Sequence, residues 1–125
     1  MAKRYKKDFL RGVLVEILQN SGGHSQIISD VVNVVIESSL RGLDTHGIAM
    51  VPKILKRCKE GRSQLSKPAE VISKEKGFSI AAMEGHLAPG QHSCLAATRL
   101  AKLLAAQRGV GLVTVRNSTH FGGCI

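Results

Sequence analysis

The sequence has 125 residues, enough for one compact domain with a core. Hydrophobic residues make up 43% of it, but one Tyr, three Phe and no Trp leave a core that must be aliphatic, and no apolar run is long enough for a transmembrane helix. Eighteen Lys and Arg against nine Asp and Glu give a formal charge of +9, which favours anionic partners such as phosphates, nucleic acids or acidic small molecules.

Apolar residues recur at helical spacing in the N-terminal third of the chain. The spacing predicts helices over residues 8–20 and 25–40, with Ser25 as the N-cap of the second and Gly42 at its end. The second stripe consists of β-branched residues, but its helical period outweighs their strand propensity. We expect the two stripes to pack on each other and to bury Val32 between them.

A short third helix is predicted next, with Pro52 in its first turn and Gly61 at its end. Its inner face would carry Val51, Ile54, Leu55 and Cys58. The basic residues from position 53 to position 76 are interpreted as a solvated helix face and loop.

The period then shortens to that of strands. Residues 69–75 and 78–84 predict two short strands joined by a Lys-Gly turn. Turn residues at 85–91 open an alanine-rich helix that runs to residue 108, and the apolar run 110–115 predicts a strand buried on both faces. The helix would bury Ala96, Ala97, Leu100, Ala101 and Leu104.

This order predicts an α+β fold of three helices, two strands, a helix and a strand. We divide it into a helical segment, residues 1–61, and a mixed α/β segment, residues 62–125. The sequence shows neither an internal repeat nor a low-complexity linker.

The cysteines and the remaining histidines give no sign of a disulfide framework or a metal site. Cys58, Cys94 and Cys124 are odd in number and lack CxxC spacing, and the N-terminus has no signal peptide, so we expect reduced thiols and a cytoplasmic protein. His86 and His92 with Cys94 match no usual zinc spacing, and we expect no metal.

The segment "RGLDTHGIAMVP", residues 41–52, places Asp44, Thr45 and His46 in consecutive positions before Gly47. One interpretation is a helix start, because Asp and Thr side chains cap free amides. The other is a ligand site, because the positive end of a helix favours a neutral imidazole that hydrogen-bonds a polar ligand.

A second histidine lies in "RNSTHFGG", residues 116–123. His120 follows the predicted buried strand, and ligands of open sheets collect at the carboxyl ends of strands. It is a candidate for proton transfer, since imidazole both gives and takes a proton near neutral pH. The alternative is a turn or capping histidine.

Two long segments carry a family resemblance. "SSLRGLDTHGIAMVPKILKRCKEGR" and "GVGLVTVRNSTHFGG" resemble the two signature segments of the type-2 malate/L-lactate dehydrogenase family. That family is distinct from the Rossmann-fold lactate and malate dehydrogenases and includes ureidoglycolate, sulfolactate and ketimine-reducing members. The pairing of both segments at this separation is specific, whereas either alone would be weak.

The resemblance implies an NAD(P)-dependent oxidoreductase that interconverts a 2-hydroxy acid and its 2-oxo acid, in a homodimer with an unusual α+β fold. It implies that His120 is the general acid/base and that Thr45 and His46 line the pocket for substrate and cofactor. Asn117 would support that pocket. The cofactor carries the redox chemistry in such enzymes, so no metal is needed.

The chain departs from the family at one position and in length. Family members commonly carry Arg four residues after the motif histidine, where this chain has Met50, so the bidentate contact to the substrate carboxylate is either missing or made by another residue. Lys53, Arg41 and Arg116 are the candidates, although Lys is a point charge and does not reproduce the planar fork of Arg. Family members also run to several hundred residues, so the resemblance covers only their N-terminal portion. We therefore expect the short chain to be inactive alone.

Two other functions stay open. The high positive charge suits a small nucleic-acid-binding protein, although stacking aromatics are scarce. Alternatively, the chain is a non-catalytic partner that joins a full-length homologue through residues 8–20 and 25–40.

Overall fold

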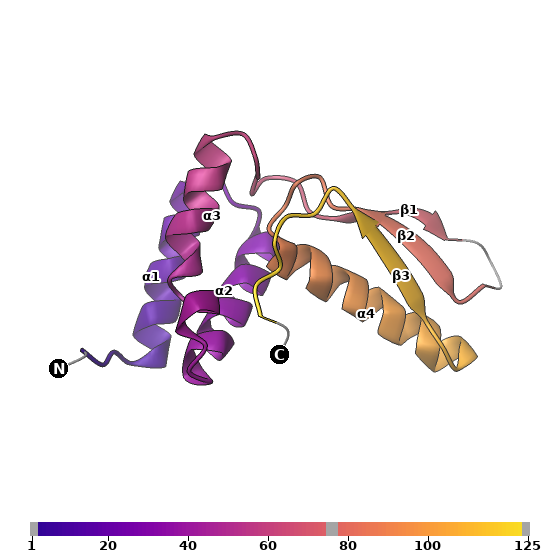
Figure 1. Cartoon of the computed structure of the whole chain (residues 1–125), viewed down its shortest axis with the longest axis horizontal. Helices are drawn as coiled ribbons and strands as arrows, with labels where there is room; N and C mark the ends of the chain where they lie inside the picture. Colours follow the sequence, from indigo (N-terminus) through magenta and orange to yellow (C-terminus); the bar gives the residue numbers. More distant parts are fainter. Residues whose placement is uncertain (1–2, 75–77, 124–125) are drawn as a thin grey trace.

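The computed structural model of the chain describes residues 3–74 and 78–123. Three helices pack side by side at one end of the molecule, and a small sheet with a fourth helix forms the other end (Figure 1). The elements in chain order are α1 Lys7–Asn20, α2 Ser25–Leu40, the 3-10 turn η1 Asp44–His46, α3 Met50–Lys59, β1 Glu70–Lys74, β2 Ile80–Glu84, α4 Gly90–Arg108 and β3 Leu112–Arg116.

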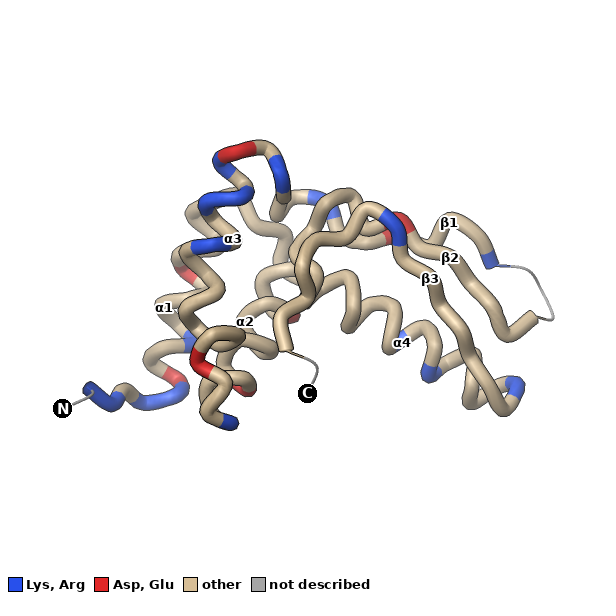
Figure 2. Tube along the Cα trace, in the orientation of Figure 1, with Lys and Arg blue, Asp and Glu red and all other residues tan. Residues whose placement is uncertain are grey.

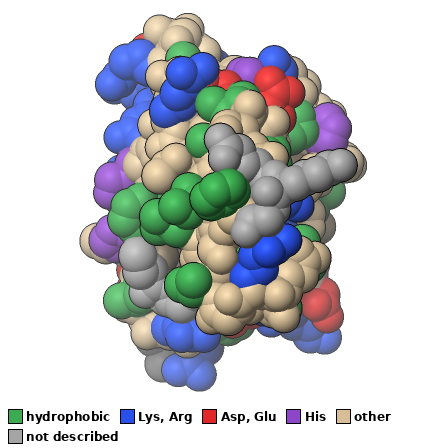
Figure 3. Space-filling model, turned by 90° about the vertical axis from the view of Figure 1, so that its right-hand side faces the viewer, with side chains coloured by type: hydrophobic (Ala, Val, Ile, Leu, Met, Phe, Trp, Pro, Cys, Tyr) green, Lys and Arg blue, Asp and Glu red, His purple; other side chains and the backbone are tan. Residues whose placement is uncertain are grey.

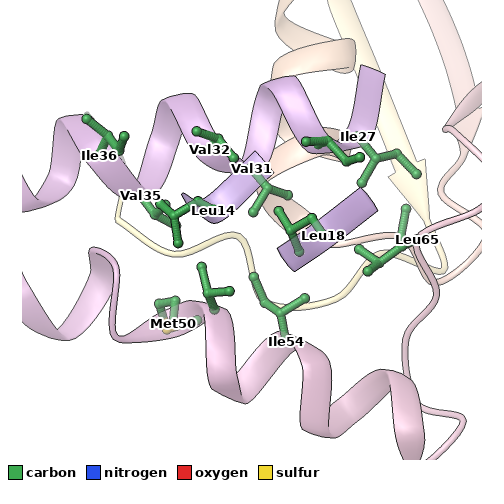
Figure 4. Close-up of a cluster of buried hydrophobic side chains, with 13 residues drawn as sticks. Leu14, Leu18, Ile27, Val31, Val32, Val35, Ile36, Met50, Ile54 and Leu65 are labelled. Carbon is green, nitrogen blue, oxygen red and sulfur yellow. The ribbon is translucent and has the colours of Figure 1, made fainter. Parts of the chain in front are cut away.

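The core lies where α1, α2 and α3 meet, and its side chains are almost all aliphatic (Figure 4). The predicted packing of the first two helices is confirmed, because Leu18 and Val32 are both fully buried. From α3, Val51 and Ile54 complete this core. Helical spacing of apolar residues therefore located each of the first three helices.

The ends of these helices agree with the sequence except at one cap. His24, not Ser25, is the N-cap of α2, because its Nδ1 accepts a hydrogen bond from the backbone N–H of Gln26. Ser25 is already the first helical residue, so the prediction of Ser25 as N-cap was wrong. Gly42 follows the last turn of α2 with φ of +76°, which suits a residue without Cβ.

The sheet has the strand order β1-β2-β3. β1 and β2 pair antiparallel, with a bulge between Val71 and Ser73, and their predicted Lys-Gly turn lies outside the described residues. β2 and β3 pair parallel and are connected through α4, which packs on one face of the sheet (Figure 1). The two predicted strands, the alanine-rich helix and the final strand are all confirmed.

The burial predicted for this half of the molecule was largely wrong. In β3, exposed residues alternate with half-buried ones, because β3 is an edge strand and α4 covers only one of its faces. The predicted inner face of α4 buries Leu104 fully, while its alanines and Leu100 stay half-buried. Ile80 and Leu112, on the open face, are more than half exposed.

The surface carries both basic and apolar areas. Lys and Arg follow α3 and the start of α1 (Figure 2), and Lys53, Lys56 and Lys59 are exposed, as expected of a solvated helix face. Figure 3 shows hydrophobic side chains grouped among basic ones on the end of the molecule opposite α1. In the described part of the chain, no helix has the length and apolarity needed to cross a bilayer.

Candidate functional site

His46 lies at the end of η1, between α2 and α3. Both interpretations of its motif placed it at a helix start, and both were wrong on this point, because Asp44–His46 form a separate 3-10 turn and α3 begins only at Met50. The turn is held against α2, where the Ser39 hydroxyl accepts from the N–H of Ile48 at 3.0 Å. A Cβ at Gly47 would overlap that hydroxyl, which explains the glycine after the histidine.

His120 follows β3 and is carried across the start of α4. The N–H of Gly90, the first residue of α4, donates to Thr119 Oγ1 at 3.1 Å. A Cβ at Gly90 would overlap the Thr119 carbonyl and the Phe121 backbone, so this close approach requires glycine. Thr119 and Phe121 thus cover the N-terminus of α4. In a Rossmann fold, by contrast, a helix N-terminus is open and binds the cofactor pyrophosphate.

The structure brings the two motif histidines together. The ring centroids of His46 and His120 are 6.0 Å apart, with 25° between the ring planes. Gly123 lies beside them, since a Cβ there would come within 3.6 Å of His46 Cβ. Two histidines that are far apart in the sequence therefore form one wall.

Each imidazole is oriented through its Nδ1 atom. Thr45 Oγ1 lies 3.0 Å from His46 Nδ1, and the N–H of Gly122 donates to His120 Nδ1 at 2.9 Å. His46 is half-buried and His120 is exposed, so the pair is accessible to solvent. An aromatic ring needs about 3.5 Å on each side, so no ligand ring fits between the imidazoles; a ligand would instead meet their edges.

Asn117 is directed to a different cluster. It has φ of +52°, and its side-chain amide donates to Glu84 Oε2 at 3.1 Å. Arg116 Nε donates to the same oxygen at 2.7 Å. Hydrogen bonds from the His86 backbone N–H, Arg116 and Asn117 lower the pKa of Glu84 to about 2. The predicted pocket role of Asn117 therefore stays a prediction, and in the described residues its amide is engaged by Glu84.

The departure at Met50 leaves this wall without an obvious carboxylate clamp. Met50 is buried in the core of the helical end. Of the three substitutes considered, Arg116 is held by Glu84, while Arg41 and Lys53 are exposed. Neither of these two forms an ion pair within residues 3–74 and 78–123.

A cleft of about 260 Å³ opens next to the segment that carries His120. Gln91 contributes to it, yet its side chain is only 1% exposed, and neither Oε1 nor Nε2 has a hydrogen-bond partner among the described residues. A buried polar group without a partner costs about 1–3 kcal/mol. In the sequence, Gln91 is only the last of the turn residues at 85–91, which does not reveal that its side chain is buried. The cleft is lined by Val34, Gln91, Cys94, Leu95, Thr98, Phe121 and Gly123.

A buried ionic cluster joins the two ends of the molecule and was not foreseen. Asp30 on α2 accepts from His92 Nδ1 at 2.7 Å and from both terminal nitrogens of Arg99 on α4. Burial alone would raise the pKa of Asp30, but these hydrogen bonds lower it below its ordinary value. Because His92 Nε2 accepts from the N–H of Ala69, the neutral ring carries its proton on Nδ1. In the sequence, Asp30 only interrupts the apolar residues of the second predicted helix, which does not reveal a buried acceptor.

His86, the other histidine considered as a metal ligand, contacts Glu70 through Nε2 at 2.8 Å. Within the described residues, no three His, Cys, Asp or Glu side chains are grouped closely enough to hold a metal ion. The third residue of that set, Cys94, is exposed near the start of α4. Cys124, expected to be a reduced thiol, lies outside the described residues.

Comparison with known proteins identifies the family of the chain. Residues 5–125 match the malate/L-lactate dehydrogenase family. The chain belongs to that family. The match covers both histidine motifs, and the observed α+β fold is the one that the resemblance implied.

Relatives and solved structures share its fold over nearly all of its length. Hydroxycarboxylate dehydrogenase B of Escherichia coli is 29% identical over 95% of the chain and 32% of its own length. L-sulfolactate dehydrogenase of Methanocaldococcus jannaschii is 31% identical over 88% of the chain and 31% of its own length. Malate dehydrogenase of Entamoeba histolytica superposes with a TM-score of 0.89 at 27% identity, covering 98% of the chain and 34% of that structure. The chain thus spans about a third of these relatives.

Two clefts lie near the residues predicted for the site. The cleft lined by Phe121 and Gly123 has about 260 Å³, below the range of about 300–1,000 Å³ usual for drug-sized ligands, whereas the cleft lined by Arg116 and Asn117 has about 810 Å³. The N-terminus of α4 is covered by Thr119 and Phe121, so it offers no phosphate site. The edges of His46 and His120 present ring nitrogens that can hydrogen-bond a polar ligand.

Proposed function

We propose that this chain supplies the proton-transfer wall of a 2-hydroxyacid dehydrogenase. The observation that carries the proposal is the pairing of His46 and His120 at 6.0 Å, since these are the two histidines of the family motifs. The names of the relatives, which include malate and sulfolactate dehydrogenases, support a 2-hydroxy acid as the substrate class.

In this proposal the two histidines have different tasks. His120 takes the proton of the substrate hydroxyl at Nε2 during oxidation and returns it to the carbonyl oxygen during reduction, because its Nδ1 faces its own loop. His46 orients the substrate through a hydrogen bond, with Thr45 fixing the ring at Nδ1. The redox equivalent comes from NAD or NADP.

Three further properties belong to the proposal. The family resemblance supports a homodimer for the whole enzyme, and the cysteine pattern supports a cytoplasmic location. Because the chain spans only about a third of its relatives, we expect no measurable oxidation of NADH or NADPH by the 125-residue chain with pyruvate or oxaloacetate.

A fusion tests the proposal. The chain replaces the matched third of a relative, and oxidation of NADH and NADPH is measured with a panel of 2-oxo acids. We expect turnover by the fusion and none by the 125-residue chain, with the double variant His46→Ala and His120→Ala as the matched control. A folded fusion that is inactive on every acid reduced by the parent relative would refute the proposal, and so would turnover by the double variant.

A further inference from the structure

His120 is held in one tautomer by the backbone of its own loop. The N–H of Gly122 donates to His120 Nδ1, and a peptide N–H can only donate. In the neutral ring Nδ1 therefore carries the lone pair and Nε2 carries the proton. In this arrangement neither nitrogen takes a proton from a substrate, because the lone pair of Nδ1 is engaged and Nε2 is already protonated.

Proton acceptance at Nε2 requires the Gly122 N–H to leave Nδ1. The base form of His120 carries its proton on Nδ1, and the imidazolium carries one on each nitrogen. In both forms an Nδ1–H would face the Gly122 N–H, which sets two donors against each other. Gly122 is buried, so its displaced N–H needs another acceptor inside the protein.

Gln91 lies where that acceptor is needed. A Cβ at Gly122 would be 3.2 Å from Gln91 Nε2 and 3.9 Å from its Cδ, so the side-chain amide packs against the Gly122 backbone. Both polar atoms of this amide are buried and lack partners among the described residues. A turn about the last torsion of Gln91 exchanges Oε1 and Nε2, and Gly122, at φ of +85°, is free of side-chain strain when its peptide rotates.

We propose that Gln91 is a positioning residue for His120, whose amide oxygen accepts the Gly122 N–H whenever His120 Nδ1 carries a proton. The exposed ring changes tautomer through solvent, and its Nε2 is then free. When the substrate reacts, the hydroxyl O–H bond breaks and an Nε2–H bond forms, while Nδ1 keeps its proton. The catalytic part rests on the function proposed above, but the exchange of hydrogen-bond partners needs neither substrate nor cofactor.

Lowering the pH of the intact 125-residue chain protonates His120 and therefore prepares the state with a proton on Nδ1. NMR on protein labelled with 13C and 15N, under conditions where circular dichroism is native, reports the tautomer of His120, the solvent exchange of the Gly122 amide and couplings across its hydrogen bond. We expect the Nε2–H tautomer at high pH. On protonation we expect the Gly122 amide to stay protected and to show a scalar coupling across the hydrogen bond to the Gln91 side-chain carbonyl.

Gln91→Met keeps the length of the side chain but removes the acceptor. In this variant Gly122 should stay protected at high pH and exchange about tenfold faster than in the wild type once His120 is protonated. Gln91→Glu, which retains an acceptor of the same length, should restore protection. The Gln26 amide, which donates to the exposed imidazole of His24, should respond to pH equally in all variants and is the internal control.

Equal protection of Gly122 in the wild type and in Gln91→Met once His120 is protonated would overturn the proposal. If the variant fails to fold, the wild type alone decides, because absence of the coupling to Gln91 in the acid form contradicts the proposal directly. An inactive fusion leaves these measurements unchanged, so failure of the proposed function and failure of this inference are distinguishable.

Discussion

The helical end of the molecule encloses its apolar side chains, whereas the sheet leaves many of its own exposed. In the helices, Leu18 and Val32 are fully buried, while Ile80 and Leu112 on the open face of the sheet are 54% and 55% exposed. The helical end therefore provides most of the hydrophobic stabilisation, and the sheet serves mainly to carry the segment with His120. Since His46 comes from the helical end, the histidine pair exists only while the two ends stay docked.

The largest expected effect is loss of the helical core. Val32→Asp places an unpaired charge at a fully buried position of α2, at a cost of about 3–5 kcal/mol, comparable to the whole stability of a small domain. Circular dichroism should show no cooperative unfolding transition. Ser29→Asp, on the exposed face of the same helix, is the control and should melt like the wild type. A cooperative transition in Val32→Asp at the wild-type temperature would disprove this assignment of the core.

The next largest effect should come from the cluster that docks the two ends. Asp30→Ala removes the acceptor shared by His92 and Arg99 and should cost about 3 kcal/mol in urea unfolding, because His92 is left buried with an unsatisfied donor. Glu37, like Asp30, lies on α2, and Glu37→Ala, which breaks its exposed ion pair with Lys7 of α1, should change stability little. Equal effects of the two substitutions would show that the buried cluster does not dock α2 to α4.

Acid sensitivity should arise in the sheet. The pKa of Glu84 is lowered from 4.5 to about 2, so ionised Glu84 stabilises the folded state above about pH 4.5, and this contribution is lost as the pH falls toward 2. The difference in unfolding free energy between the wild type and Glu84→Gln should therefore narrow over that range. Glu16→Gln, on the exposed face of α1, is the matched control. A difference that stays constant with pH would contradict the role given to Glu84.

The smallest effect is expected on the open face of the sheet. Leu112→Thr should change the unfolding free energy by about 0.5 kcal/mol or less, because Leu112 is more than half exposed and Thr suits a strand. Leu104→Ala, on the covered side in α4, should cost about 2–5 kcal/mol. Similar losses in both variants would mean that the open face is covered in solution.

The comparison also shows what a sequence predicts and what it does not. The period of apolar residues located α2 at Ser25–Leu40 as predicted, because one buried face determines a helix. It did not show that β3 is an edge strand, since an apolar run has the same pattern whether one neighbour covers it or two. The burial of an uncovered strand depends on its partners, which local sequence does not encode.

The residues of the candidate site also divide into those that the sequence predicted and those that it did not. The motifs identified His46 and His120, but the 3-10 turn at Asp44–His46 was missed because capping residues favour a helix start and a tight turn alike. Asp30 and Gln91 were missed because a buried polar residue is recognised only by the partners that it has or lacks in three dimensions.

The most direct test of the central claim is the kinetic difference between the two histidines in the fusion enzyme. His120→Ala should lower kcat roughly 100-fold or more, the range expected for a positioned proton-transfer group. His46→Ala should chiefly raise KM, because it removes substrate binding and leaves proton transfer in place. A His120→Ala enzyme whose kcat equals that of the parent fusion across about pH 6 to 9 would contradict the account, because proton transfer would then not depend on His120.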